Sequence, residues 1–191
     1  MIIGIHGFKQ SGKDTLADLL VEEFGFEKIA FADRLKNALN TIFNVPKEDL
    51  WGSDDDKKKL TSVKWNSLVG LSREDRFDEE YLNIRELMQI FATEICRSYI
   101  PGIWYEFLKI KQGENIVISD VRFENEAIFL RSKNAHLIKV KRNDVYSSEH
   151  LSEKGIDDDL MDKVFLNNGS LEEFLVNSKK ELADWIESIG K

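Results

Sequence analysis

The chain has 191 residues, of which 42% are hydrophobic and 32% are charged, and its net charge is -8. This length and composition fit one globular domain with a buried core, and they exclude a disordered chain. No apolar stretch approaches the roughly 20 residues of a membrane-spanning helix, and the negative charge disfavours binding to a nucleic-acid polymer. The single cysteine, Cys96, cannot form an internal disulfide, so we expect a cytoplasmic protein.

The chain opens with a short apolar run at 2–6, followed by the loop GFKQSGK at 7–13. The run predicts a buried strand, and apolar residues at helical spacing after the loop predict a helix that ends at Gly25. The loop matches G-x-x-x-x-G-K, in which glycines let backbone N–H groups surround a phosphate and the lysine reaches the β and γ phosphates. We therefore expect ATP to be bound by Gly7, Gln10, Ser11, Gly12, Lys13, Asp14 and Thr15.

Asp14 stands where most phosphate loops carry a serine or threonine that binds magnesium. A carboxylate can itself offer an oxygen to Mg2+, directly or through water. It can also complement the positive N-terminus of the helix, and both interpretations stay open. Thr15, one residue further round the helix, would bond to the α phosphate.

The middle of the chain alternates between periodic and irregular segments. We expect a strand at 27–32 and then a helix at 33–43 that Asp33 caps. Residues 51–80 carry dense charge without periodicity, which predicts an irregular, mobile insertion. Pro101 predicts the start of a helix at 101–108. Before it, a helical pattern at 83–100 carries, opposite its apolar stripe, Arg85, Gln89, Thr93 and Arg97.

The last third of the chain continues the alternation of strands and helices. Expected strands lie at 114–120, 135–141 and 164–166, with a helix at 123–133. The polar segment at 143–160 predicts a mobile, lid-like region, and a capping box of Ser170 and Glu173 starts the final helix. This alternation predicts a three-layer α/β fold with a mainly parallel central sheet.

Asp120 closes a strand at its carboxyl end, where open parallel sheets place their ligands. An acid there can hold Mg2+ through water or bind a substrate hydroxyl or amide, and it can instead cap the following helix. Phosphoryl transfer to an acceptor phosphate needs no strong base, because the attacking oxygen is already ionised, but it needs alignment and positive charge. Candidate cations, each of which can also be an ordinary surface charge, are Lys13, Lys36, Arg85, Arg97, Arg122 and Arg142.

Segments spread in order along the chain resemble the phage-type deoxynucleoside monophosphate kinases, which have the P-loop nucleoside monophosphate kinase fold. The matching segments are GFKQSGKDTLAD at 7–18, FADRLKNAL at 31–39, RELMQIFATEICR at 85–97 with Trp104, SDVRFENEA at 119–127, HLSEKG at 150–155 and NNGSLEEF at 167–174. The family reads G-K-D-T at the loop, so Asp14 is normal for it. Ala92 departs from the family, in which a glycine is expected before Thr93.

The resemblance implies a single kinase domain over 1–191 that uses ATP to phosphorylate deoxynucleoside monophosphates to diphosphates. It implies Mg2+ as cofactor at Asp14, catalytic roles for Lys13, Asp120 and Arg122, and a mobile nucleotide-covering region at 143–155. Arg142 and His150 accompany that region, and Arg142 would contact ATP. The residues implied around the acceptor nucleotide are Lys9, Lys36, Arg85, Gln89, Thr93, Trp104, Asp120, Arg122 and Glu126.

Two alternatives stay open on the sequence alone. One is another small-molecule P-loop kinase, of the phosphomevalonate or dephospho-coenzyme A kinase type. The other is a nucleotide-binding switch that hydrolyses ATP slowly. The sequence has no compelling residue to position the attacking water, which disfavours this alternative. A homodimer is compatible with the sequence, and a phage-encoded chain would act in the cytoplasm of its host.

Overall fold

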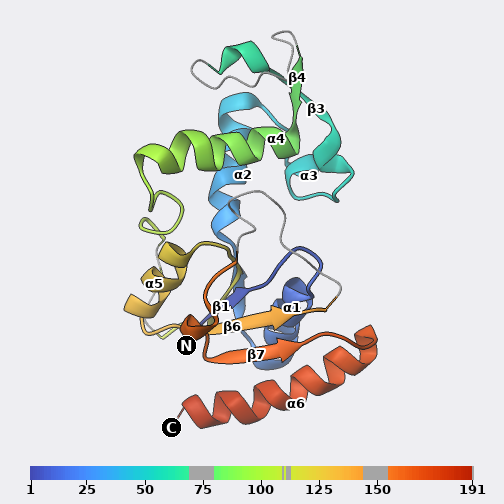
Figure 1. The fold of residues 1–191 in the computed structure, drawn as a ribbon, viewed down its shortest axis with the longest axis vertical. Coiled ribbons are helices and arrows are strands. Elements are labelled where there is room, and N and C mark those ends of the chain that lie inside the picture. Colours follow the sequence, from blue (N-terminus) through green and yellow to red (C-terminus); the bar gives the residue numbers. More distant parts are fainter. Residues whose placement is uncertain (69–79, 109, 111–112, 144–154, 191) are drawn as a thin grey trace. The chain divides into compact units, whose positions relative to one another are not determined.

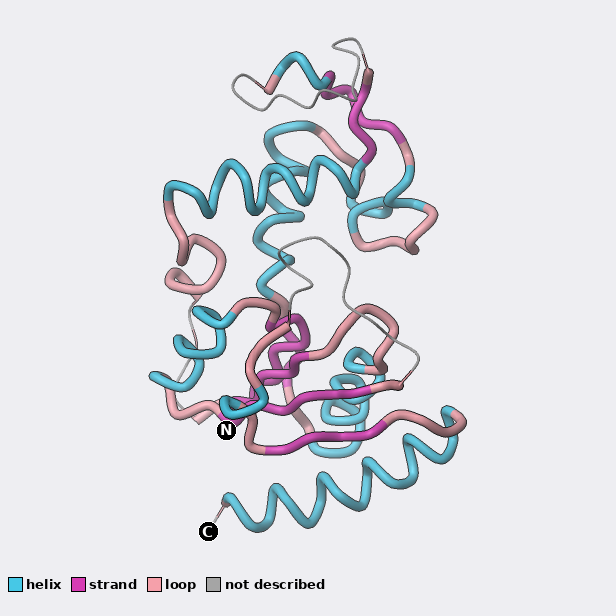
Figure 2. The backbone as a smooth tube through the Cα atoms, viewed as in Figure 1, coloured by secondary structure: helices cyan, strands magenta, loops and turns pink. Residues whose placement is uncertain are grey.

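In the computed structural model of the protein, the residues described are 1–68, 80–108, 110, 113–143 and 155–190. The packing divides the chain into two compact units, and each contains a sheet of its own (Figure 2). Unit 1 consists of Met1–Phe31 and Tyr105–Lys191, and unit 2 consists of Ala32–Trp104. The single kinase domain expected from the sequence stays a prediction, because a packing unit and a functional domain are different divisions of a chain.

Unit 1 contains a five-stranded sheet in which every described pair of neighbouring strands is parallel. Its strands, in spatial order, are β2 (Glu27–Ile29), β5 (Ile116–Val121), β1 (Ile2–His6), β6 (His136–Lys141) and β7 (Lys163–Leu166). The apolar run at the start of the chain therefore forms the central strand. The parallel sheet predicted from the sequence is confirmed, although β2 ends three residues earlier than expected.

One layer of helices covers the face of the sheet to which Ile3 and Ile5 point. Helices α1 (Lys13–Phe24) and α6 (Leu171–Ile189) lie on this side and pack against each other (Figure 1). Their apolar residues join those of the strands in one core cluster, in which Leu16, Leu20 and Leu182 are fully buried. Burying such leucines stabilises the fold by about 2 kcal/mol each.

The opposite face of the sheet is covered by α5 (Glu124–Ser132). Gly4, which points to this side, has no room for a side chain, because a Cβ there would lie 2.8 Å from Leu130 of the helix. Successive residues of β1 thus face different helical layers, as the pleat of a strand requires. The three-layer α/β arrangement predicted from the sequence is confirmed.

Unit 2 is mainly helical and carries a second, two-stranded antiparallel sheet. Its elements are α2 (Phe31–Phe43, whose first residue belongs to unit 1), α3 (Lys47–Leu50), η1 (Asp56–Lys58), β3 (Leu60–Lys64), η2 (Trp65–Ser67), β4 (Tyr81–Asn83), α4 (Ile84–Gln89) and η3 (Ile90–Arg97). The sheet pairs β3 with β4. Residues 51–80 were expected to be irregular, and the structure differs in forming η1, β3 and η2 there. Because β3 is half exposed and pairs with a strand of three residues, it leaves little periodicity to detect.

The long helical pattern at 83–100 is correct in position but not in type. It begins as the α-helix α4, capped by a reciprocal box between Asn83 and Glu86, and continues as the π-helix η3. In a π-helix, hydrogen bonds join residues i and i+5, which makes the helix wider than an α-helix. The polar residues four apart, expected on one slowly turning α-helical face, therefore do not keep that arrangement in η3. Propensity and periodicity do not distinguish an α-helix from a π-helix.

Two connecting segments also depart from the expectations. Residues 101–107 form consecutive turns rather than the expected helix, with bonds from Ile103 N to Ile100 O and from Leu108 N to Tyr105 O. The expected lid at 143–160 falls largely on 144–154, which lie outside the described residues. Its described end is tied to β6, because Lys139 Nζ donates to Ile156 O over 2.9 Å and pairs with Asp158 of η5 (Asp158–Leu160).

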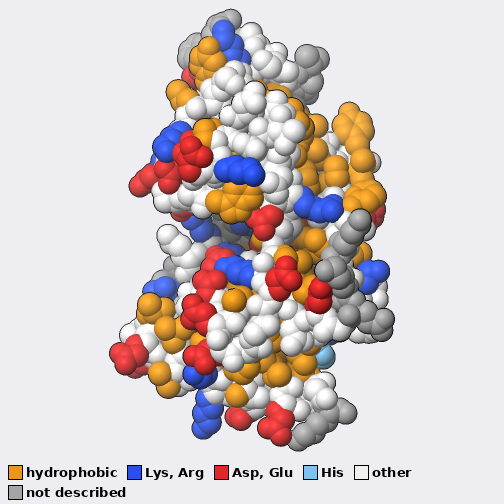
Figure 3. Space-filling view, turned by 180° about the vertical axis from the view of Figure 1, so that it is seen from behind, with side chains coloured by type: hydrophobic (Ala, Val, Ile, Leu, Met, Phe, Trp, Pro, Cys, Tyr) orange, Lys and Arg blue, Asp and Glu red, His pale blue; other side chains and the backbone are white. Residues whose placement is uncertain are grey.

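The described helices and one face of the surface can be compared with what a membrane and a phosphate polymer would require. Among the described residues, no helix combines the length and apolar composition that a membrane crossing requires. On the face drawn in Figure 3, acidic and basic side chains alternate, and the described Lys and Arg side chains do not merge into one area.

Candidate functional site

The loop between β1 and α1 is shaped by two residues with positive φ. Gln10 has φ 64° and Gly12 has φ 101°, and Ser11 N bonds to Phe8 O over 3.1 Å. Gly12 is the N-cap of α1 and has no side chain with which to bond the first N–H groups of the helix. Backbone N–H groups that turn inward at an uncapped helix N-terminus form an anion-binding nest. The predicted phosphate loop therefore has the geometry that binding requires.

The two glycines of this loop, Gly7 and Gly12, have no room for a side chain. A Cβ on Gly7 would lie 2.4 Å from Ser11 Oγ, and one on Gly12 would lie 2.4 Å from Asn167 Nδ2. Asn167, the first residue after β7, is buried and donates from Nδ2 to Ser11 O over 2.9 Å. It holds the loop from a point far along the chain. Sequence reasoning quoted NNGSLEEF only as a family-like segment and missed this role.

A chain of charges runs from the loop lysine to β2. Lys13 Nζ lies 3.5 Å from Asp14, whose side chain is 65% exposed, and Lys28 Nζ lies 3.7 Å from the same carboxylate. Lys28 also pairs with Asp18 over 2.8 Å. Sequence reasoning missed Lys28, which follows a short strand without any motif. The carboxylates of Asp14 and Asp18 are exposed to solvent, so these ion pairs contribute little to stability and leave Asp14 available to another cation.

The donors at the loop fit a magnesium ion that is bound mainly by phosphate. Within the described residues, no group of three His, Cys, Asp or Glu side chains gathers as a metal site. Mg2+ is commonly held by one or two carboxylates together with substrate phosphates and water. Asp14, exposed beside the phosphate loop, meets that requirement.

A buried histidine connects the loop strand to β5. His6 is 4% exposed, and its Nδ1 lies 2.9 Å from Val121 O, which accepts a hydrogen bond and therefore fixes the proton on Nδ1. Nε2 is buried with no partner in the described part of the chain. Burial lowers the pKa of His6, and the nearby charges of Lys139, Lys13 and Arg122 lower it further, against the bond to Val121. Lys13 and Arg122 thus lie near one buried ring.

Asp120 and Glu126 have defined structural contacts in unit 1. Asp120 Oδ1 accepts from Phe31 N over 2.7 Å, so it caps the first residue of α2 rather than the helix that follows it in sequence. Glu126 is buried, and its Oε2 accepts from Arg122 N over 2.8 Å and from Phe123 N over 3.1 Å. These contacts fix the turn that carries Arg122, which is half-buried. Roles of Asp120, Arg122 and Glu126 toward an acceptor stay predictions.

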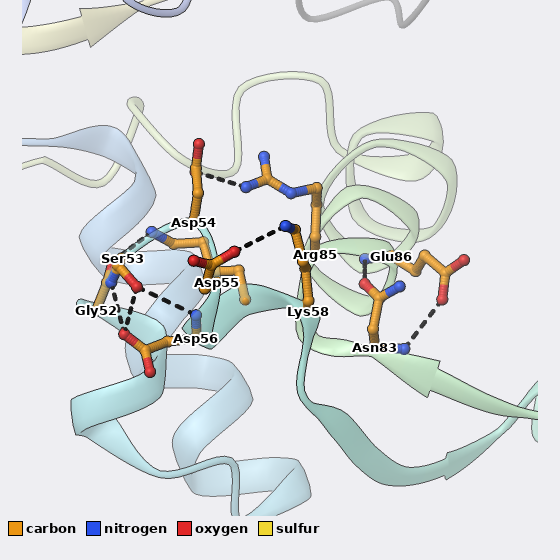
Figure 4. A network of polar contacts seen from close by, with 10 residues as sticks. Gly52, Ser53, Asp54, Asp55, Asp56, Lys58, Asn83, Arg85 and Glu86 are labelled. Atoms are coloured by element: carbon orange, nitrogen blue, oxygen red, sulfur yellow. Dashed lines mark hydrogen bonds and ion pairs between the residues drawn. The ribbon is translucent and has the colours of Figure 1, made fainter.

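In unit 2, Lys36 and Arg85 both contact the segment after α3. Lys36 Nζ lies 5.0 Å from the centre of the Trp51 ring, and the Trp51 indole donates to Asp33 over 2.9 Å. Arg85 Nη2 donates to Asp54 Oδ1 over 2.6 Å (Figure 4). The structure therefore brings together two cations that the sequence assigns to the acceptor, and it adds Trp51, which sequence reasoning missed.

The remaining predicted residues fall into two groups. In unit 2, Gln89 ends α4, Thr93 lies in η3, and the buried Trp104 donates from Nε1 to Ala92 O over 3.2 Å. Trp104 thus contacts the position where the family pattern has glycine, next to Thr93. In unit 1, Lys9 and Arg142 are exposed. The structure gives them no buried position, and their contacts with nucleotides stay predictions.

Comparison with known proteins adds the family to this geometry. The family model described as deoxynucleotide monophosphate kinase matches residues 1–78 and 53–178. A protein of Acanthamoeba polyphaga mimivirus, provisionally assigned as a deoxynucleotide monophosphate kinase, is 32% identical over 91% of this chain and 92% of its own. The deoxynucleoside-5'-monophosphate kinase of Escherichia phage T5 is 24% identical, over 82% and 85% respectively.

A third relative is the deoxynucleotide monophosphate kinase of Enterobacteria phage T4, which is 23% identical over 95% of this chain and 98% of its own. A solved gluconokinase from Sinorhizobium meliloti 1021 covers 98% of this chain at 13% identity, with a TM-score of 0.44 that adds nothing to the topology. The family match spans both units, and the phosphate loop opens a three-layer sheet as a P-loop kinase requires. The chain belongs to the deoxynucleotide monophosphate kinase family.

Proposed function

We propose that this chain transfers the γ-phosphoryl group of ATP to a deoxynucleoside monophosphate, giving ADP and the deoxynucleoside diphosphate. The observation that carries the proposal is the nest at Gln10–Gly12, with Lys13 beside it, in a chain of the deoxynucleotide monophosphate kinase family. A kinase of this family is a phosphotransferase. The acceptor and the donor assignments below belong to the proposal.

The donor side of the proposal rests on unit 1. The backbone N–H groups of the loop bind the ATP phosphates, and Lys13, whose side chain is 12% exposed, stabilises the charge that moves onto the leaving oxygen. Mg2+, bound with Asp14, supplies charge neutralisation across the phosphates. Thr15, half-buried one residue further, takes the α phosphate, and Arg142 contacts ATP from outside the loop.

The residues that we assign to the acceptor are found in unit 1 and in unit 2. The phosphate oxygen of the acceptor is ionised at neutral pH, so the protein has to hold it in line rather than deprotonate it. Lys36, Arg85 and Arg122 supply the positive charge for this, and Gln89, Thr93 and Trp104 shape the nucleoside pocket. Lys9, Asp120 and Glu126 complete the proposed acceptor set.

A panel of acceptors tests the function. ADP release is measured by a coupled assay with the standard deoxynucleoside monophosphates, their ribose counterparts, phosphomevalonate and dephospho-coenzyme A. The proposal predicts release that depends on a deoxynucleoside monophosphate. Release that ignores every acceptor would support the switch instead, and a response to either other compound would support that other kinase type.

The setting of the reaction is part of the same proposal. A cytoplasmic location, in a host cell where the gene is phage-borne, suits an enzyme whose substrates are free nucleotides. A homodimer stays a prediction, and phosphoryl transfer by the residues named above does not depend on it.

A further inference from the structure

The segment Trp51–Lys57 of unit 2, which we call the Trp51 turn, is held in one shape by its own side chains. Ser53 N and Ser53 Oγ donate to Asp56 Oδ2 over 2.8 and 2.7 Å, and Asp56 N donates back to Ser53 Oγ over 3.2 Å (Figure 4). Hydrogen bonds from Lys59 and Ser53 lower the pKa of Asp56, so it stays ionised. A turn fixed in this way can position functional groups.

Cations from separate elements converge on this turn. Lys36 of α2 lies over the Trp51 ring, Lys57 of η1 donates from Nζ to Gly52 O over 2.8 Å, and Arg85 of α4 bonds to Asp54. Their partners, Trp51, Gly52 and Asp54, fall within four consecutive residues. The three positive groups therefore gather around one short piece of backbone.

The three cations at this place differ in their carboxylate partners. Asp33 lies 3.8 Å from Lys36, and Asp54 binds Arg85, but Lys57 has no carboxylate within ion-pair distance among the described residues. Burial lowers the pKa of Lys57, and repulsion from Lys36 and Arg85 lowers it further. Attraction to Asp54 and Asp56 opposes this shift. Like charges that are gathered and half-buried are unfavourable unless an anion joins them.

We infer that Lys57 binds the phosphate of the acceptor nucleotide together with Lys36 and Arg85, and that the Trp51 ring holds Lys36 in position for this. The ligand class is a phosphate monoester dianion, which three cations from different directions can grip through separate oxygens. This inference rests on the proposed function, and it adds a phosphate-binding residue from a segment in which the sequence showed only dense charge.

Lys58 provides a matched control for Lys57. It is the next residue of the same short helix, its side chain is 72% exposed, and it pairs with Asp55 over 2.7 Å (Figure 4). Lys57→Gln and Lys58→Gln therefore remove the same charge one position apart. Only the first removes a cation that bonds to the backbone of the Trp51 turn, whereas the second removes one that already pairs with a carboxylate.

Calorimetric binding of the standard deoxynucleoside monophosphates, and of the deoxynucleosides that lack the phosphate, tests the inference. Lys57→Gln should weaken nucleotide binding about tenfold or more, whereas Lys58→Gln should change it by less than about twofold. Affinity for ATP, and any affinity for the deoxynucleosides, should be equal in both variants. The inference would be overturned if both variants bound the nucleotides with equal affinity. It would also be overturned if Lys57→Gln lost as much affinity for the deoxynucleosides as for the nucleotides.

Lys57→Arg guards against a trivial loss of structure. It keeps the charge and should stay within about threefold of the natural protein in acceptor affinity, with an unchanged melting temperature. If the arginine variant loses as much as Lys57→Gln, charge is not the reason and the inference fails. If the natural protein shows neither acceptor-dependent ADP release nor nucleotide binding, the proposed function fails as well. If the natural protein releases ADP in response to acceptor, but Lys57→Gln and Lys58→Gln bind nucleotide equally well, only the inference is refuted.

Discussion

The candidate phosphate sites of unit 1 and unit 2 are built from different parts of the chain. In unit 1 the donors are backbone N–H groups, presented by Gly12 at the N-terminus of α1. In unit 2 they are the long side chains of Lys36, Lys57 and Arg85, which start from separate elements. A backbone site depends on loop shape, and a side-chain site depends on the charge of each cation. The two should therefore fail in different ways when they are mutated.

The largest expected effect is on the donor side. Lys13→Ala should lower kcat by about a hundredfold to a thousandfold, because the lysine acts on charge that develops in the transition state. Since Asp14, the carboxylate beside Lys13, is 65% exposed, losing that ion pair should hardly change the melting temperature. Steady-state kinetics with thermal denaturation check both statements. Near-normal turnover in a folded variant would remove the donor assignment.

On the acceptor side, Arg85→Ala should raise the acceptor KM or lower turnover by about thirtyfold, the equivalent of about 2 kcal/mol for a charge-assisted bond. The same direction is expected for Lys36→Ala and Arg122→Ala. ATP affinity should stay the same in all of these variants. If ATP binding falls while acceptor saturation is unaffected, these residues belong to the other nucleotide.

Asp54 sharpens that test. Asp54→Asn removes the carboxylate partner of Arg85, which lies 2.6 Å away, without removing the cation. Acceptor affinity should therefore stay equal or rise. A loss as large as that of Arg85→Ala would show that the ion pair itself, and not a free guanidinium, is what the site needs.

A smaller effect is expected at the metal. Asp14→Asn keeps the shape of the side chain but removes a negative charge, so the Mg2+ concentration for half-maximal rate should rise about threefold to tenfold. Asp18→Asn is the matched control, because Asp18 shares Lys28 with Asp14 but lies one turn further along α1. Equal magnesium titrations for both variants would reduce Asp14 to a helix-end charge.

The smallest effect is a dependence of stability on pH. His6 is buried and neutral, and its folded-state pKa lies below the ordinary 6.5, so the unfolded chain binds a proton more readily. Stability should therefore fall as pH drops below about 6.5 and should not fall above it. His6→Asn can keep the bond to Val121 O without titrating. Urea unfolding between about pH 7 and about pH 5 should show a smaller loss for this variant, and an equal loss would assign the dependence to other groups.

How far the sequence predicts each site follows from how the site is built. The loop at Gly7–Lys13 is local, and its glycines, flanking strand and helix period are all visible in order, so its geometry was predicted. Asn167 acts on Ser11 from far along the chain, and Lys57 lies near Lys36 and Arg85, which come from other segments; no hydrophobic period marks either residue. The sequence identified Lys36 and Arg85 as candidate acceptor residues. Their contacts with Trp51 and Asp54 could not be predicted, because they depend on the fold of the Trp51 turn.

The same reasoning explains the errors in the fold. The parallel sheet was predicted because its buried strands are continuous apolar runs. The strand β3 was missed because its partner β4 has three residues, and the turns at 101–107 replaced a helix that Pro101 permits but does not impose. The change from α4 to the π-helix η3 comes with a hydrogen bond from Trp104 Nε1 to Ala92 O, a contact from outside the helix that local preference does not predict.

The account as a whole is tested most directly by the stoichiometry of the products. Nucleotides are separated by chromatography after incubation of the protein with ATP, Mg2+ and a deoxynucleoside monophosphate, and ADP and the deoxynucleoside diphosphate are both quantified. The account predicts equal amounts of the two, and no ADP when the acceptor is left out. ADP that accumulates at the same rate without acceptor, with no deoxynucleoside diphosphate formed, would contradict it.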